Sequence, residues 1–205
     1  MNIPKITNIL EKFKDTNKIE SFDSVIEAHS FWDRHLNLGD IDEEVGAAIE
    51  GMIRFWNQYD DENNIPVEER KPIKIYIDSN GGDLGAAFTM MDAIRMSKTP
   101  VWTINIGSAY SGGFFTFITG HKRFAYPHSS FLFHEGSAQG SGTSGQFENF
   151  SAFYKKQLSR VKDNILEYTK VSDELYEEKK REDWWLDANE ALELGICDEI
   201  IKEFI

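Results

Sequence analysis

Apolar positions along the chain follow two spacings, which predict strands and helices in turn. Residues 73–77 carry isoleucine at every second position, as in a strand with one buried face. The apolar residues of 84–96 recur at helical spacing, and the glycine-rich stretch 78–82 makes a turn between the two. The same order returns with a strand predicted over 101–106 and a helix over 111–119. Repeated strand-turn-helix units predict an α/β fold with a largely parallel sheet.

The remaining pattern predicts further elements of the same two kinds. Acidic residues crowd the start of 41–56, which favours the first turn of a helix there. The expected elements are a helix over 41–56, a loop over 57–72, short strands over 123–126 and 130–134, a glycine- and serine-rich loop over 136–145, a long amphipathic helix over 146–168, a helix over 188–194 and a strand over 196–201.

The chain of 205 residues is long enough for one well-buried domain, which we place at 31–205. Residues 1–30 are predicted to form an N-terminal arm. Within this arm, the apolar residues of 2–14 have the spacing of a short amphipathic helix. We expect the arm to serve as a docking or assembly element.

Composition excludes several classes of function. With 22 lysines and arginines against 35 aspartates and glutamates, the net charge of −13 disfavours nucleic acid and anionic membranes as partners. Cys197 has no internal disulfide partner, and no cysteine or histidine cluster has zinc-site spacing, so we expect neither metal nor cofactor. The N-terminus lacks the apolar core of a signal peptide. A reducing, cytoplasmic location is the expectation.

Candidate chemistry gathers where the two predicted turns follow parallel strands. Gly81-Gly82 and Gly112-Gly113 let the backbone approach a ligand closely, and their N–H groups could converge on one oxygen as an oxyanion hole. Ser111 begins an apolar helix, whose dipole favours an alkoxide-like oxygen. His134 ends a strand at the same edge and is the best candidate base. Asp183 could orient it and has apolar neighbours to shield its carboxylate, although spacing alone does not single it out.

Each of these residues has a purely structural alternative. A serine at a helix start is commonly an N-cap, a glycine pair is commonly a turn, and a histidine ending a strand is commonly part of the core or the surface. The combination of nucleophile, base, acid and converging N–H groups favours the catalytic interpretation.

These residues resemble the proteolytic subunit of the Clp protease. Residues 75–82 are similar to the family's strand and glycine turn, and 106–113 to its nucleophile motif. Residues 122–125 with Phe133-His134 are similar to the stretch that ends in the catalytic histidine, and 183–198 to the segment that begins with the catalytic aspartate. The resemblance covers about residues 31–201, in the same order and with the same spacing.

The resemblance implies a serine endopeptidase with a crotonase-like fold. The triad is then Ser111, His134 and Asp183, with the N–H groups of Gly82 and Gly112 as the oxyanion hole. It implies homo-oligomeric, heptameric rings that enclose the active sites, with the helix 146–168 as a protruding handle between rings. The substrates are polypeptides, fed by an AAA+ unfoldase. The chain itself has no nucleotide-binding loop.

Three positions depart from the family pattern and motivate an alternative. Residues 78–82 read Asp-Ser-Asn-Gly-Gly where the family usually has Asn-Ser-Pro-Gly-Gly, and Glu135-Gly136 replaces the usual Gln-Pro. Arg181-Glu182 stands where the family commonly has Asp-Arg. The alternative is a catalytically impaired homologue that acts as a co-assembling or scaffold subunit. Acyl-CoA conversion on the same scaffold, and a Ser/Lys signal-peptide peptidase, fit the Ser, His and Asp residues less well.

Overall fold

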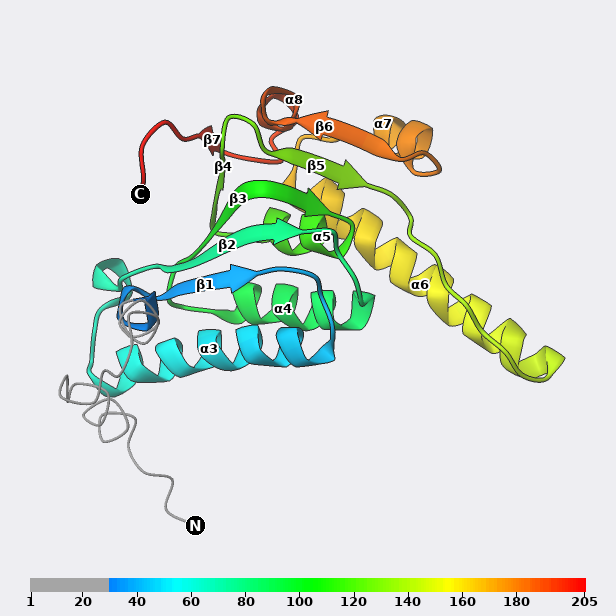
Figure 1. Ribbon diagram of the computed structural model, residues 1–205. Helices are drawn as coiled ribbons and strands as arrows, with labels where there is room; N and C mark the ends of the chain where they lie inside the picture. The colour runs from blue at the N-terminus through cyan, green and yellow to red at the C-terminus, as the bar shows by residue number, and fades with distance from the viewer. Residues whose placement is uncertain (1–29) are drawn as a thin grey trace, which may run out of the picture.

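The computed structural model describes residues 30–205, which form a sheet with helices packed against it (Figure 1). The strands are β1 (His35–Leu38), β2 (Ile73–Ser79), β3 (Val101–Tyr110), β4 (Lys122–Ala125), β5 (Ser130–Phe133), β6 (Trp184–Asp187) and β7 (Glu199–Ile200). The main helices are α3 (Glu43–Glu62), α4 (Leu84–Met96), α5 (Gly112–Ile118), α6 (Ser144–Tyr168), α7 (Asp173–Lys179) and α8 (Ala188–Glu193), with a 3₁₀ turn η2 (Val67–Glu69). The expected arm over residues 1–30 lies almost wholly outside the described residues.

Strand β3 is the centre of the sheet and divides it in two. The order is β1-β2-β3-β4-β7, and all of these neighbours pair in parallel. The first half of β3 pairs with β4, whereas its last residues, 108–110, pair with β5. Strand β6 then adds to β5 in the antiparallel direction. The sheet therefore forks at the carboxyl end of β3, where Ser111 follows.

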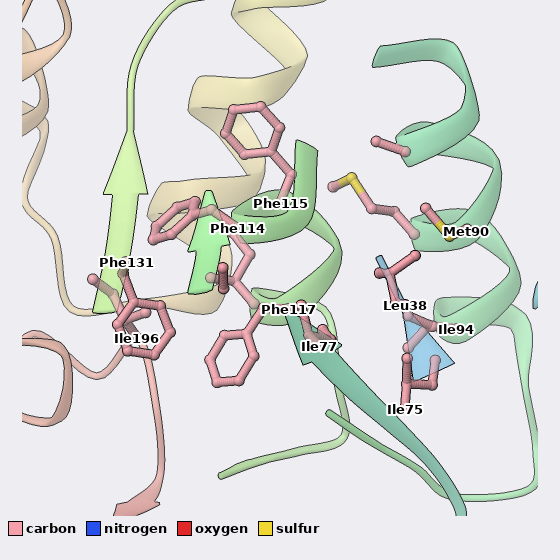
Figure 2. Packing of buried hydrophobic residues seen from close by; sticks show 14 of the residues in the cluster. Leu38, Ile75, Ile77, Met90, Ile94, Phe114, Phe115, Phe117, Phe131 and Ile196 are labelled. Carbon is pink, nitrogen blue, oxygen red and sulfur yellow. The ribbon is translucent and has the colours of Figure 1, made fainter. Parts of the chain in front are cut away.

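The main core fills the space between the sheet and helices α3, α4 and α5. Figure 2 shows two groups of buried side chains that meet there, an aliphatic group from β1, β2 and α4 and an aromatic group from α5 and β5. Phe117 and Phe131, for example, pack edge to face with ring centroids 5.0 Å apart, and both are fully buried. Burying one such side chain stabilises the fold by roughly 1.5–3 kcal/mol. The core thus fixes α5, and Ser111 at its start, firmly against the sheet.

Helix α6 is the expected handle and projects away from the body (Figure 1). It begins at a capping box in which Thr143 and Gln146 satisfy each other's backbone N–H groups. Its buried residues, Val161, Asn164 and Ile165, all lie in the half nearest the body. The stretch 134–143 that leaves β5 runs along the free half of the helix to its tip (Figure 1).

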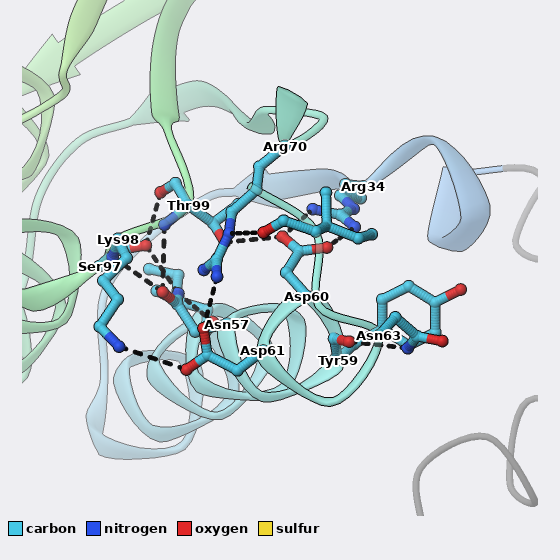
Figure 3. Close-up of polar contacts among 12 residues, drawn as sticks. Arg34, Asn57, Tyr59, Asp60, Asp61, Asn63, Arg70, Ser97, Lys98 and Thr99 are labelled. Carbon is cyan, nitrogen blue, oxygen red and sulfur yellow. Dashed lines mark hydrogen bonds and ion pairs between the residues drawn. The ribbon is translucent and has the colours of Figure 1, made fainter. Parts of the chain in front are cut away.

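A buried ion pair fixes the other end of the molecule, where β1 begins. Arg34 donates from Nη1 to Asp60 Oδ2 at 2.8 Å and from Nη2 to Oδ1 at 2.6 Å, and Thr99 adds a hydrogen bond of 2.7 Å to the same carboxylate. Figure 3 shows this carboxylate at the centre of a network that continues through Arg70 and Asn57. Helix α3, β1 and the turn into β3 are therefore tied together by satisfied polar groups.

The same network explains where the sequence-based prediction of the first helix was wrong. Helix α3 continues to Glu62, beyond the predicted end at residue 56. Asn57 begins the predicted loop, but its side chain bonds to Ser97 Oγ and accepts the N–H groups of Lys98 and Thr99. Long-range partners thus satisfy polar residues that otherwise favour a loop. Strand β3 also runs to Tyr110 rather than to Ile106, and β1, β6 and α7 were not predicted.

Candidate active site

Ser111 lies at the fork of the sheet, between the end of β3 and the start of α5. Its N–H donates to Leu132 O at 2.9 Å, which continues the pairing of β3 with β5. Its backbone has φ 50° and ψ −117°, a conformation that costs about 1–3 kcal/mol for a residue other than glycine. Although Ser111 occupies the N-cap position, its side chain makes no capping hydrogen bond. The strained turn thus presents a hydroxyl that the helix does not use.

The glycine turn after β2 lies directly against this serine. Gly81 has φ +96°, and a Cβ built on it would come within 2.7 Å of Ser111 Cβ and of the Tyr110 carbonyl oxygen. Gly82 has φ +145°, and its Cβ would come within 2.0 Å of Ile41 O. Both positions therefore require glycine, for close approach as well as for backbone conformation. The glycine pair lets the turn pack against the candidate nucleophile.

Two backbone N–H groups next to this serine, those of Gly82 and Gly112, have no acceptor among residues 30–205. Ile41 bonds to the neighbours of Gly82, through Ile41 N–H to Gly81 O and Asp83 N–H to Ile41 O, so the N–H of Gly82 points away from that bridge. Gly112 is the first residue of α5, whose N–H has no partner within the helix. The Gly82 nitrogen lies 3.5 Å from the position a Cβ on Gly112 would take.

His134 and Asp183 are brought together by the pairing of β5 with β6. The antiparallel register sets Phe133 opposite Trp184. His134, which follows β5, therefore faces Asp183, which precedes β6. His134 Nδ1 and Asp183 Oδ1 are 3.5 Å apart. The side chains are 35% and 64% exposed, respectively. Sequence reasoning expected apolar neighbours to shield Asp183, and this is wrong for the isolated chain because Trp184 and Trp185 leave its carboxylate in solvent.

The hydroxyl of Ser111 and the imidazole of His134 line the same pocket without touching. Among the described residues, no hydrogen bond joins the two side chains. Catalytic hydrogen bonds are often long in proteins without substrate and shorten on binding. The pocket thus brings Ser111 and His134 to one cavity, and Asp183 contacts His134 from outside its lining.

The pocket that contains these groups has a volume of about 430 Å³. Its lining includes Ser111, His134, Gly82 and Gly112. The larger apolar and aromatic side chains of the lining are Leu84, Phe115, Tyr154, Leu158 and Val161. Three of these come from α6 at positions i, i+4 and i+7, and sequence reasoning did not single them out. The signal was present as the apolar stripe of the amphipathic helix.

Asp78 and Asn80, which depart from the family's usual turn sequence, each make hydrogen bonds to neighbouring segments. Asp78 Oδ1 accepts both the N–H of Ser108 at 3.0 Å and its hydroxyl at 2.6 Å, which joins the carboxyl ends of β2 and β3. Asn80, at the position where the family usually has proline, donates its N–H to Asp40 Oδ1 at 2.9 Å. A hydrogen bond that proline could not make thus holds the turn in place.

The described residues offer neither a reactive thiol nor a cluster of metal-ligating side chains. Cys197 is buried, and burial raises the pKa of its thiol to about 11, so the reactive thiolate is disfavoured. No cluster of three or more potential metal-ligating side chains occurs within residues 30–205. In the same part of the chain, no helix has the length and apolar character needed to cross a membrane.

Comparisons with known proteins agree on one protein family for this chain. Residues 66–204 match the family described as Clp protease. The chain is 34% identical over 135 residues to the ATP-dependent Clp protease proteolytic subunit 2 of Treponema pallidum, covering 65% of this chain and 68% of that protein. It is also 34% identical over 139 residues to the proteolytic subunit 1 of Chlamydia muridarum, covering 65% and 72%.

The fold agrees as well. A ClpP1 mutant from Listeria monocytogenes superimposes with a TM-score of 0.74 at 24% identity, covering 87% of this chain and 96% of that one. This likeness confirms the ClpP/crotonase-like architecture with its handle. The family match over most of the chain, the relatives and the fold agree, and the chain belongs to the Clp protease family.

Proposed function

We propose that the chain is a serine endopeptidase that hydrolyses peptide bonds of unfolded proteins or peptides through Ser111, His134 and Asp183. The hydroxyl oxygen of Ser111 attacks the peptide carbonyl carbon, and His134 takes the hydroxyl proton. The carbonyl oxygen becomes an oxyanion within reach of the N–H groups of Gly82 and Gly112. His134 then gives its proton to the leaving amine, which departs and leaves an acyl-enzyme.

Hydrolysis of the acyl-enzyme repeats the same steps with water. His134 takes a proton from water as the oxygen attacks the ester carbon, and Ser111 leaves with that proton. Asp183 holds the imidazole with Nδ1 toward itself, so Nε2 faces the serine, and it stabilises the imidazolium that forms in each step. Each half-reaction thus uses the same donors and the same base.

One observation carries the proposal: Ser111 has a strained backbone, no capping bond and two unpaired backbone N–H groups beside it. A serine that only caps a helix would use its hydroxyl for the cap, and nothing would favour the strain. The strain and the glycine contacts are accounted for if the hydroxyl has to be presented to a substrate.

Covalent labelling tests the proposal. A fluorophosphonate added to the purified chain should add one adduct at Ser111, detected by intact mass and peptide mapping, and the adduct should be absent in Ser111→Ala. His134→Ala should slow labelling by about 10²-fold or more. Ser108→Ala is the matched control, because Ser108 lies near the end of β3, three residues before Ser111, and donates its hydroxyl to Asp78. Labelling that persists in Ser111→Ala would refute the proposed nucleophile.

A catalytically impaired subunit is the second candidate, and two observations favour it. The contact of 3.5 Å between His134 and Asp183 is longer than a hydrogen bond, and the Asp183 carboxylate is largely exposed. Such a subunit would co-assemble with an active partner or act as a scaffold. Absence of labelling and of peptide turnover in the correctly assembled protein would favour this candidate over the peptidase.

Assembly into homo-oligomeric rings is part of the proposal. Phe147, Phe150 and Phe153 expose 54%, 38% and 56% of their surface on the free half of α6, which is a large apolar area for a monomer. The names of the relatives also describe a proteolytic subunit of an ATP-dependent protease. We therefore propose heptameric rings and an AAA+ unfoldase partner for this chain. Mass determination in solution, with Phe147→Ser and Phe153→Ser together, tests the role of the handle.

A further inference from the structure

Tyr154 lies where the handle helix first meets the body of the protein. Residues 144–150 of α6 are all exposed, whereas Tyr154 is half-buried and lines the pocket that holds Ser111 and His134. Its ring stacks on Phe150, with centroids 6.4 Å apart and planes 12° apart. The side chain thus has a fixed place between the free half of the handle and the candidate active site.

The hydroxyl of Tyr154 reaches the segment that carries the candidate base. It donates to the carbonyl oxygen of Glu135 at 3.0 Å, and Glu135 directly follows His134. The chain turns at Gly136, with φ +73°, and a Cβ there would lie 3.7 Å from the same hydroxyl. Among the hydrogen bonds of residues 30–205, this one alone joins residues 134–142 to α6.

The ring of Tyr154 has a second role in the pocket. With Leu158 and Val161 it forms one stripe along α6, and Phe115 from α5 extends the apolar wall. Within this stripe, Tyr154 is the residue nearest the free end of the helix and the largest side chain. Tyr154 is not part of the main core, so shortening its side chain enlarges the pocket along this apolar wall and leaves the core residues in place.

The hydroxyl remains a donor over the pH range in which peptidases are assayed. Burial, together with the nearby Glu135 carboxylate, raises the pKa of Tyr154 above its ordinary value. The phenol therefore stays protonated and can donate to a carbonyl oxygen throughout that range.

We infer that Tyr154 positions His134 and sets the size of the substrate side chain that the pocket accepts, an inference that rests on the proposed peptidase function. The hydroxyl restrains the backbone next to the proposed base, and the ring limits the space along the apolar wall of the pocket. Handle and base are thereby connected through one hydrogen bond. A handle that tilts away from the body releases the segment after His134.

Two substitutions separate the two roles. Tyr154→Phe keeps the ring and removes the hydrogen bond, so kcat on a short peptide should fall about fivefold with KM unchanged, as the loss of one neutral hydrogen bond predicts. Tyr154→Ala removes the ring, so the ratio of kcat/KM for a large aromatic over a small apolar side chain should rise about tenfold. Tyr168→Phe is the matched control, because it lies on the same helix and does not line the pocket.

Hydrogen–deuterium exchange gives a readout that does not need activity. In a Ser111→Ala background, Tyr154→Phe should speed exchange of the amides of residues 134–142, while Tyr168→Phe should not. Unchanged exchange, or a kcat of Tyr154→Phe equal to that of Tyr168→Phe, would overturn the positioning role, and an unchanged size preference in Tyr154→Ala would overturn the specificity role. If the unaltered chain is neither labelled by the fluorophosphonate nor cleaves peptides, the proposed function fails. The exchange result still shows whether the Tyr154 hydrogen bond restrains residues 134–142.

Discussion

Two pairs, each of one basic and one acidic side chain, lie at different ends of the molecule and differ in burial and in contact distance. Arg34 and Asp60 are 5% and 0% exposed and make two short hydrogen bonds, with Thr99 and the Lys71 carbonyl satisfying the remaining groups. His134 and Asp183 are partly exposed and 3.5 Å apart. The first pair fixes the fold, and the second pair is open to solvent and free to adjust. Stability and the proposed catalysis are therefore separable in this chain.

The largest expected effect is the loss of peptide turnover when the proposed nucleophile is replaced. Ser111→Gly should abolish peptide turnover, with a loss of about 10⁶-fold in kcat as for other serine peptidase nucleophiles. The same change should raise the free energy of unfolding by about 1 kcal/mol, because glycine adopts φ 50° without strain. Peptide turnover and urea denaturation measure the two effects. A variant that is less stable than the original chain would contradict the strain at Ser111.

Breaking the buried pair should have the opposite outcome. Asp60→Ala leaves the Arg34 guanidinium buried without its partner and should lower the free energy of unfolding by about 3–5 kcal/mol. The double variant Arg34→Met with Asp60→Leu should recover most of that loss. Urea denaturation compares the three proteins. If the folded fraction of Asp60→Ala lost specific activity in the way that Ser111→Gly does, the two ends would not be separable.

The exposed pair should matter for turnover and not for the fold. Asp183→Asn should lower kcat by about 10²-fold, less than the roughly 10⁴-fold loss in a triad with a buried aspartate, because solvent already weakens the contact. The free energy of unfolding should change by no more than about 0.5 kcal/mol. Steady-state kinetics with matched denaturation curves test this. Unchanged kcat would remove Asp183 from the proposed triad.

The smallest effect concerns a surface cluster beside the site. Hydrogen bonds from Lys162 and Lys180 hold the pKa of Glu177 at about 2 in the folded chain. A folded pKa below the unfolded value near 4.5 stabilises the fold above that value, and the stabilisation is lost as the pH falls toward 2. The Tm advantage over Glu177→Gln should therefore be present at neutral pH and vanish between pH 4.5 and pH 2. Glu148→Gln, exposed on the handle, is the control.

Local sequence patterns alone pointed to the proposed nucleophile and base. Ser111 and His134 each follow a strand, and the carboxyl ends of parallel strands meet, so their proximity could be expected without a structure. Asp183 was different. Its place depends on the antiparallel pairing of β6 with β5, a contact between segments far apart in the chain, and only the family resemblance pointed to it.

Other features could not be predicted because their local patterns have more than one meaning. The apolar stripe of α6 does not indicate whether Tyr154 faces a core or a pocket. Asn57 favours a loop until its partners in the 97–99 turn are known. The solvent exposure of the Asp183 carboxylate depends on the residues around it in space, and tryptophans adjacent in the sequence do not guarantee that they shield it from solvent.

The position of β6 near the end of the described chain has a consequence for synthesis. Translation proceeds from the N-terminus at about 5–20 residues per second, so Ser111 and His134 leave the ribosome well before Asp183. Strand β6 supplies both the missing edge for β5 and the carboxylate that faces His134. With the proposed triad, a nascent chain carries a nucleophile whose base is not yet oriented. The proposed cleavage therefore reaches its full rate only after β6 has paired with β5.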